Sequence, residues 1–451
     1  MFGQGFTKLS FATAIFFLIP SLGVTETLRD SLRNAYQNSG LLVQNRALLR
    51  AADERVVVGV ASLRPIITWS SNYSQTSSAP NRLTTSLNGS WLLYDFGQSE
   101  LGIKVLKETV FATRQSLISI EQDVLLRAVT AHMKYLRAVE FVSLRLANVK
   151  LITQELSASE DRFEVGEVTR TDVALAEARL ANASAGFAAA EGDLAIASAE
   201  FYSVTGRVPD TLISPDSLPD LPKDVDAAIA LARLHHPDLK EVQHSVAAAE
   251  LKLKSAKLSN RFSVSGAIGL SNSDLKSNLT QTFGLTAKGT LYSGGAAASK
   301  PRMAMAERDA TRAKLHVTQL RLDRLVRSSF VELNVARATG AATDRQVQAA
   351  SVAFRGVREE ASLGARTTLD VLNAEQELLD ARVSRISTKI DEQIAAYTAL
   401  ASIGKLTALS LDLGVKTYDP TEYYNLVKTA PIAKSKQGRA LDKVLNALVG
   451  E

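Results

Sequence analysis

The chain has 451 residues, with 52 lysines and arginines against 47 aspartates and glutamates, and no cysteine. This nearly balanced charge argues against a nucleic-acid partner, because such proteins concentrate basic residues on one face. A chain without cysteine forms no disulfide, and it can enter an oxidising compartment without needing one.

The first 23 residues have the pattern of an export signal. Lys8 precedes an apolar run from Leu9 to Ile19, and the small residues Ser21 and Gly23 follow it. The run is too short to cross a bilayer as a helix, so we expect residues 1–23 to be a signal peptide. No later apolar run reaches the roughly 20 residues of a spanning helix, so any membrane-spanning part would have to be built from strands.

A helix followed by a β-hairpin is expected next. Residues 29–62 have a helical pattern, which Pro65 ends. Segments 66–73 and 83–95 are rich in Thr, Ser, Trp and Tyr and alternate with a period of two, and the polar segment SQTSSAPNR joins them. Strands of about ten residues with one weakly apolar face and one small polar face are typical of transmembrane barrels, although soluble hairpins are the alternative.

A very long helix and a returning helix complete the first half. Residues 98–161 predict a helix about 96 Å long at 1.5 Å per residue, with a heptad stripe interrupted by one four-residue step. Residues 169–204 predict the return, with apolar heptad positions flanked by alanines that allow close helix packing. Between them we expect a tight turn, with Gly166 at positive φ and Thr169 as the helix cap.

The second half repeats this order. The offset is 364 − 166 = 198 for each of three pairs in the turn: Gly166 and Gly364, Thr169 and Thr367, Asp172 and Asp370. The same offset leads to expected strands at 262–271 and 282–291 and to a second long helix at 296–362, while residues 226–259 also have a helical pattern. A constant offset indicates an internal duplication with two equivalent helical tips.

The duplication divides the chain into consecutive parts. We expect the first structural repeat at 24–205, a Pro-rich equatorial linker at 206–224, and the second structural repeat at 225–405. Residues 406–451 form a C-terminal tail that should lie on the same belt, with a small amphipathic helix at 440–449.

Four strands per chain predict an oligomer. The smallest membrane barrels have about eight strands, so one chain cannot close a barrel. A dimer would give eight strands and a filled interior, whereas a trimer would give twelve and an open lumen. Small inward-facing Ser, Thr and Gly side chains favour the trimer.

Signals for catalysis, cofactors and metals are weak. The segment Ser293–Lys300 resembles a phosphate-binding loop, but Ser299 replaces the glycine needed before the lysine. None of the five histidines forms an i, i+4 ligand pair, and Asp172 and Asp370 have no histidine or nucleophile beside them in the motif. We therefore expect no enzyme activity, no cofactor and no metal.

Several motifs together resemble the TolC family of outer-membrane efflux and secretion ducts. They are VGEVTRTDV and LGARTTLDVLNA at the tips, LLYDFG between strand and helix, HHPDL near Pro237, and the duplication itself. The YDP segment of the tail resembles the alpha-proteobacterial type I secretion branch. The resemblance implies a mainly α fold, in which a trimeric twelve-stranded outer-membrane β-barrel is continuous with a periplasmic α-helical barrel.

The resemblance also implies function and partners. The trimer would export proteins, small toxic compounds or both when recruited by a periplasmic adaptor and an inner-membrane ABC or RND pump. Its inner end would be closed by a gate at Asp172, Arg366, Asp370 and Asn373. In this gate Arg366 pairs with Asp172 of the same or a neighbouring chain, and Asp370 forms an acidic ring. Ala361 departs from the family pattern, which has a tyrosine there, and Asn373 departs from it where a second acid is expected.

The tips are also the expected docking points for the adaptor. These are Gly166 to Thr169 and Gly364 to Thr367. Capping and turn formation alone are the alternative role for these residues. For the whole chain, the alternative is a periplasmic coiled-coil adaptor or scaffold without a membrane barrel.

Overall fold

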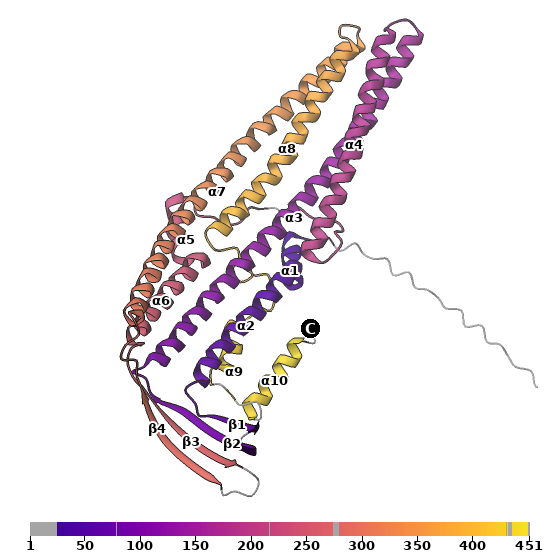
Figure 1. Ribbon diagram of the computed structural model, residues 1–451. Helices are drawn as coiled ribbons and strands as arrows, with labels where there is room; N and C mark the ends of the chain where they lie inside the picture. Colours follow the sequence, from indigo (N-terminus) through magenta and orange to yellow (C-terminus); the bar gives the residue numbers. More distant parts are fainter. Residues whose placement is uncertain are drawn as a thin grey trace, which may run out of the picture.

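The computed structural model describes residues 25–77, 79–215, 217–273, 279–429, 431 and 435–449. The expected signal peptide, residues 1–23, lies outside them. The molecule is elongated, with two long helical hairpins at one end and a β-sheet at the other (Figure 1). Its elements are α1 Leu28–Asn38, α2 Gly40–Ala61, β1 Ile66–Thr76, β2 Ala79–Tyr94, α3 Gln98–Glu164, α4 Arg170–Thr205, α5 Val225–His235, α6 Pro237–Leu258, β3 Ser263–Ser273, β4 Thr280–Lys288, α7 Ala296–Ser362, α8 Thr368–Ser402, α9 Pro420–Val427 and α10 Lys436–Val449.

The two long helices confirm the duplication. The helices α3 and α7 have 67 residues each, and each turns back into a shorter partner, α4 or α8. The α3–α4 pair is sealed by alanines: Ala176 is fully buried, and Ala183 and Ala190 are nearly so. Small side chains let the two helix backbones approach closely, as the alanine seam predicted.

The four strands form one antiparallel sheet in the order β1-β2-β3-β4. Pairing of β2 with β3 joins the two repeats, and the expected strands are confirmed with shifted ends. The last strand ends at Lys288 rather than at the expected Leu291, whose side chain is fully exposed. Trp69 on β1 and Phe283 on β4 are 71% and 76% exposed, so both outer strands carry large apolar side chains toward the surroundings.

Two expected helices are each broken, and that part of the prediction was wrong. The expected helix at residues 29–62 is interrupted at Ser39, which is extended and whose hydroxyl accepts the Leu42 N–H. The expected helix at residues 226–259 is interrupted at His236, whose ring nitrogen accepts the Asp238 N–H. Pro237 lacks an N–H and favours a new helix start, which explains the second break.

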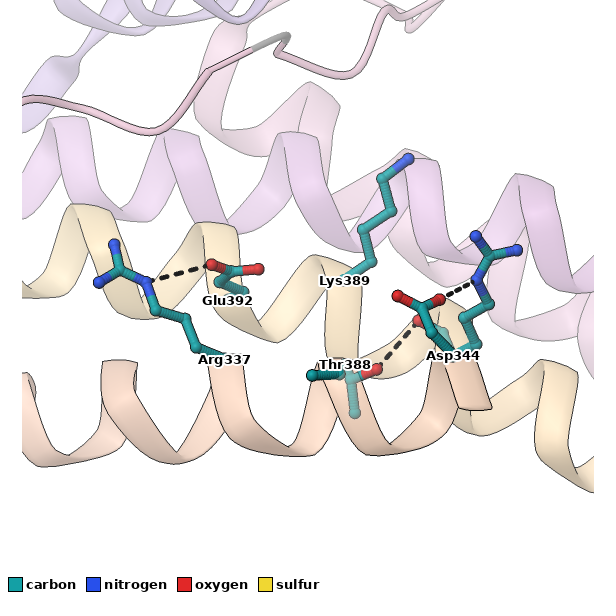
Figure 2. A pocket seen from close by; sticks show the side chains of 8 residues that line it. Arg337, Asp344, Thr388, Lys389 and Glu392 are labelled. Atoms are coloured by element: carbon teal, nitrogen blue, oxygen red, sulfur yellow. Dashed lines mark hydrogen bonds and ion pairs between the residues drawn. The ribbon is translucent and has the colours of Figure 1, made fainter. Parts of the chain in front are cut away.

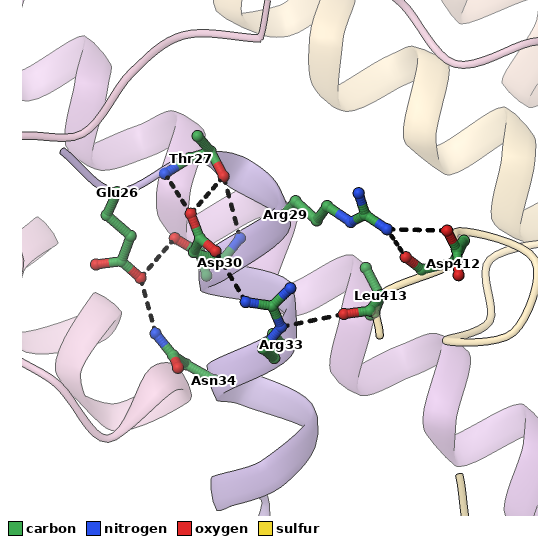
Figure 3. Close-up of polar contacts among 9 residues, drawn as sticks. Glu26, Thr27, Arg29, Asp30, Arg33, Asn34, Asp412 and Leu413 are labelled. Atoms are coloured by element: carbon green, nitrogen blue, oxygen red, sulfur yellow. Dashed lines mark hydrogen bonds and ion pairs between the residues drawn. The ribbon is translucent and has the colours of Figure 1, made fainter. Parts of the chain in front are cut away.

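The C-terminal tail contacts α1 (Figure 3), which lies between the helical hairpins and the sheet in Figure 1. The guanidinium of Arg29 donates to the backbone carbonyl and the carboxylate of Asp412, and Nε of Arg33 donates to the carbonyl of Leu413 at 3.0 Å. The linker reaches the same level, where Leu212 pairs with Glu26 in an isolated parallel bridge. The tail therefore contacts α1, and the linker pairs with the residues just before it.

A buried histidine helps to hold this belt together. Nδ1 of His132 lies 2.9 Å from the Ser31 hydroxyl, and Nε2 lies 3.1 Å from the carbonyl oxygen of Ile213. Burial lowers the pKa of His132 to about 4, which keeps the ring neutral at physiological pH. A neutral imidazole fits this polar but enclosed position.

Among the described residues, no helix is long and apolar enough to cross a membrane. The final helix, α10, begins at Lys436, four residues before the expected start at Ala440.

Candidate gate and docking tips

Both helical tips are built on the same capping frame. The hydroxyl of Thr169 accepts the Asp172 N–H, and the Asp172 carboxylate accepts the Thr169 N–H at 2.9 Å. Thr367 and Asp370 repeat both bonds, the second at 3.0 Å. This reciprocal capping box satisfies N–H groups that the first turn of a helix leaves free. The Thr-x-x-Asp spacing in the sequence is the local cause.

The glycines end the preceding helices. Gly166 and Gly364 have φ of +80° and +75°, a conformation that disfavours side chains. A Cβ on either glycine would meet no atom within 4 Å. The requirement for glycine is therefore one of backbone conformation, and the space beside each turn is open.

Each tip also presents a large apolar side chain that the sequence reasoning missed. Val165 is 72% exposed and Leu363 is 84% exposed, directly before the two glycines. They occupy equivalent positions, since 165 + 198 = 363. The sequence did contain a signal for them: an apolar residue precedes the glycine in both repeats, although the turn does not need an apolar side chain to fold.

The structure places Arg366 beside Glu360 rather than beside Asp172. Nε of Arg366 donates to Oε2 of Glu360 at 2.8 Å, and both side chains are about half exposed. The hydrogen bond to Glu360 raises the pKa of Arg366 further. The expected pairing with Asp172 of the same or a neighbouring chain stays a prediction.

The two aspartates of the expected gate are held ionised. The hydroxyl of Thr169 lowers the pKa of Asp172, and the backbone N–H of Thr367 lowers the pKa of Asp370. Hydrogen bonds to a carboxylate favour its charged form, because they are stronger to the anion than to the acid. Each tip thus carries a fixed negative charge at the start of its second helix.

Asn373 joins the two hairpins of one chain. Its Oδ1 accepts a hydrogen bond from the Arg179 guanidinium of α4 at 3.0 Å. Two residues further along α8, the carboxylate of Glu375, which is 6% exposed, accepts a hydrogen bond from the Asn148 amide of α3. Burial raises the pKa of Glu375. Arg179, Asn148 and Glu375 line a hollow of about 290 Å³ between α3, α4 and α8. Sequence reasoning did not single out Asn148 or Glu375 as part of the site.

Ion pairs hold α7 against α8 below the tip (Figure 2). Arg337 donates to Glu392 at 3.3 Å, and Arg385 donates to Asp344 at 2.6 Å. The hollow between them measures about 380 Å³, and Lys389 extends from it away from both pairs. Exposed pairs of this kind each add little stability.

Within the described part of the chain, no group of three histidine, aspartate or glutamate side chains is arranged to hold a metal ion. The site's chemistry is that of charged and apolar surface groups on two helical tips. Such groups can pair with other chains, and they form no nucleophile and base pair.

Comparison with known proteins identifies the family. The sequence profile described as "Outer membrane efflux protein" matches residues 31–207 and 228–404. The outer membrane efflux protein BepC of Brucella suis biovar 1 (strain 1330) is 32% identical over 415 residues, which cover 90% of this chain and 91% of BepC. The proteases secretion protein PrtF of Dickeya chrysanthemi is 29% identical over 388 residues, covering 76% and 82%.

A solved structure agrees at the level of the fold. The Campylobacter jejuni CmeC outer membrane channel superposes with a TM-score of 0.76 at 16% identity and covers 90% of both chains. The expected mainly α architecture with a membrane strand domain is confirmed, and an enzyme is excluded. The chain therefore belongs to the outer membrane efflux protein family, the TolC-like outer-membrane channels to which the tip motifs pointed, and not to the periplasmic adaptors.

Proposed function

We propose that the protein is a homotrimeric channel-tunnel that exports proteins, small toxic compounds or both across the outer membrane. Recruitment by a periplasmic adaptor and an inner-membrane ABC or RND pump completes the path. The observation that carries this proposal is the four-stranded sheet with β1 and β4 at its edges. An open edge in lipid leaves backbone groups without hydrogen-bond partners, so the sheets of several chains must join. Three chains give twelve strands and an open lumen.

The names of relatives support both kinds of cargo. BepC is named an efflux protein, whereas PrtF and AprF of Pseudomonas aeruginosa are named protease secretion proteins. A lumen that passes cargo without chemistry is consistent with either class.

The gate proposal rests on charges at the tips. Asp172 and Asp370 carry fixed negative charge, and Arg366 offers a planar cation beside the second turn. Threefold symmetry brings copies of each group together around one axis. In the closed trimer, Arg366 leaves or shares Glu360 to pair with Asp172 of the neighbouring chain, and Asp370 lines the constriction with Asn373 nearby.

The docking proposal rests on the apolar tips. Val165 and Leu363 stand exposed beside Gly166 and Gly364, with open space at each turn. Exposed apolar side chains at two equivalent positions suit contact with the hairpin of an adaptor, because burying them there removes apolar surface from water.

Assembly is tested by the mass of the detergent-extracted protein. Native mass spectrometry should give a trimer rich in helix. A monodisperse monomer with a cooperative melt would refute the joined-sheet argument, because a lone sheet would keep both edges open.

Docking is tested at the tip itself. Leu363→Ser should abolish export while the trimer stays in the outer membrane, since it removes the apolar contact and keeps the glycine turn. Gly364→Phe should do the same by disturbing the turn. Gly356→Phe is the control, because Gly356 also has open space but lies within α7. Export at the normal rate in Leu363→Ser would overturn the docking proposal.

A further inference from the structure

The C-terminal tail is fixed to the outside of α2 by α9. The hydroxyl of Tyr423 donates to Oε1 of Glu54 at 2.6 Å, and Tyr423 is only 6% exposed. Val427 on the same helix is fully buried. A buried tyrosine with a satisfied hydroxyl is a strong local anchor, and it fixes α9 on α2.

Two arginines hold the tail by cation–π contacts with its tyrosines. The guanidinium of Arg114 lies 5.4 Å from the ring centre of Phe111 and 5.2 Å from that of Tyr424. Arg46 lies 5.5 Å from the ring centre of Tyr418. Cations over aromatic faces attract the ring electrons and are stronger where water is excluded. The tail segment before α10 is thus held against α2 and α3.

The end of the anchored segment lies at the junction of helices and sheet. The guanidinium of Arg64 donates to the carbonyl oxygen of Thr429. Arg64 stands two residues before Ile66, the first residue of β1. Lys436, the start of α10, follows Thr429 by seven residues, so it lies within about 25 Å of that junction at full extension. In Figure 1, α10 lies beside α9 and apart from the long helices.

The sequence of α10 is amphipathic and basic. Apolar residues recur at helical spacing at Leu441, Val444, Leu445 and Leu448. On the polar side, Lys436, Arg439 and Lys443 outnumber the one acid, Asp442. Val444 is 37% exposed, so its own chain does not cover it fully. Basic polar and apolar faces together are the pattern of helices that lie in a membrane interface.

We propose that α10 lies on the periplasmic leaflet of the outer membrane, with its apolar face in the acyl boundary and its cations on anionic phospholipid headgroups. The surface is continuous with the membrane-facing strands, because the Arg64 contact places the tail where β1 leaves the helical body. Three copies of α10 in the trimer act together, so that weak individual binding becomes stable. The helices would then fix the depth and tilt of the tunnel relative to the bilayer.

The test uses the absence of cysteine, which makes any introduced cysteine unique. Val444→Cys and Asp442→Cys carry an environment-sensitive dye in the full-length protein reconstituted in vesicles with brominated acyl chains. The two positions lie on opposite sides of α10 and are both exposed. Phe283→Cys on β4, also exposed, reports the membrane position of the strands.

We expect brominated lipid to quench the dye at residue 444 at least twofold more than the dye at residue 442. If aqueous iodide quenches the dye at residue 444 as strongly as the dye at residue 442, the helix is solvated. If neither brominated lipid nor iodide quenches the dye at residue 444, that face of the helix is packed against protein. Either result overturns the proposal. If brominated lipid quenches a dye at residue 283 in vesicles of the same composition, only the α10 inference fails. If it does not, the membrane placement of the sheet fails as well.

Charge is tested separately. In the unmodified helix, anionic lipid should increase the quenching at residue 444 over that in zwitterionic lipid. Replacing Lys436, Arg439 and Lys443 with glutamine should remove this increase. The control removes three exposed cations from α7 and should leave that increase unchanged: Arg321→Gln, Arg324→Gln and Arg345→Gln. An equal loss in both variants would show that net charge, and not α10, attracts the bilayer.

Discussion

The two helical tips share a backbone and differ in charge. Both have a glycine at positive φ and a Thr-x-x-Asp capping box. The equivalent of Arg366 is Val168, however, and the equivalent of Glu360 is Arg162, so the first tip has no counterpart of the Arg366–Glu360 pair. Duplication therefore retained the residues that shape the turn and changed the charged residues beside it.

The seams below the tips differ only in degree. The α3–α4 hairpin has buried alanines and one exposed ion pair, Arg127–Glu200, whereas α7 and α8 are tied by two exposed pairs, Arg337–Glu392 and Arg385–Asp344. Exposed ion pairs can exchange partners at small cost. The second hairpin, which has more of these pairs, is the candidate for the moving part of a gate.

The largest expected difference between the hairpins lies at Glu375 and its equivalent, Glu177. Glu375→Ala leaves the Asn148 amide without its partner and should reduce the free energy of unfolding by about 1–3 kcal/mol. Glu177 is exposed, so Glu177→Ala should change it by no more than about 0.5 kcal/mol. Urea unfolding at one protein concentration measures both. Equal losses would show that the hollow between the hairpins contributes no stability.

The caps should instead behave alike. Thr169→Ala and Thr367→Ala each remove a capping hydroxyl, and each should cost about 1 kcal/mol of unfolding free energy. Serine at either position should restore most of the loss, because it keeps the acceptor oxygen. A loss at only one of the two tips would contradict the equivalence of the frames.

How far the sequence predicted these regions depends on the range of the interactions. The caps, turns and long helices depend on residues within one or two helical turns of each other. The same pattern recurs 198 residues later, so each of these elements could be predicted from two copies. The burial of Glu375 could not be predicted, because it depends on the packing of α8 against α3, and Glu177 shares its local pattern. The breaks at Ser39 and His236 were missed because a helical period continues across them, although Pro237 signalled the second.

A further effect concerns the pH dependence of stability and helix α2, which the tail covers. Burial raises the pKa of Asp53 from 3.8 to about 6, and Arg114 at 4.0 Å only partly offsets it. The folded state then holds a proton that the unfolded state releases, so this group's contribution to stability falls as pH rises from about 4 to about 6. The difference in melting temperature between wild type and Asp53→Asn should therefore change across this window and be constant above it. A melting-temperature difference that stays constant from pH 4 to 8 would exclude the raised pKa of Asp53.

Single-channel conductance in a planar bilayer tests the central claim, that the charged tip of the second hairpin keeps the channel closed. Arg366→Ser combined with Asp172→Ala should raise the conductance well above that of wild type, and Asp370→Ala should weaken block by polyvalent cations. Arg170→Ser, at an exposed cation of the first tip, is the control and should leave conductance unchanged. Wild-type conductance in the double variant, with the oligomer intact by native mass, would contradict the account.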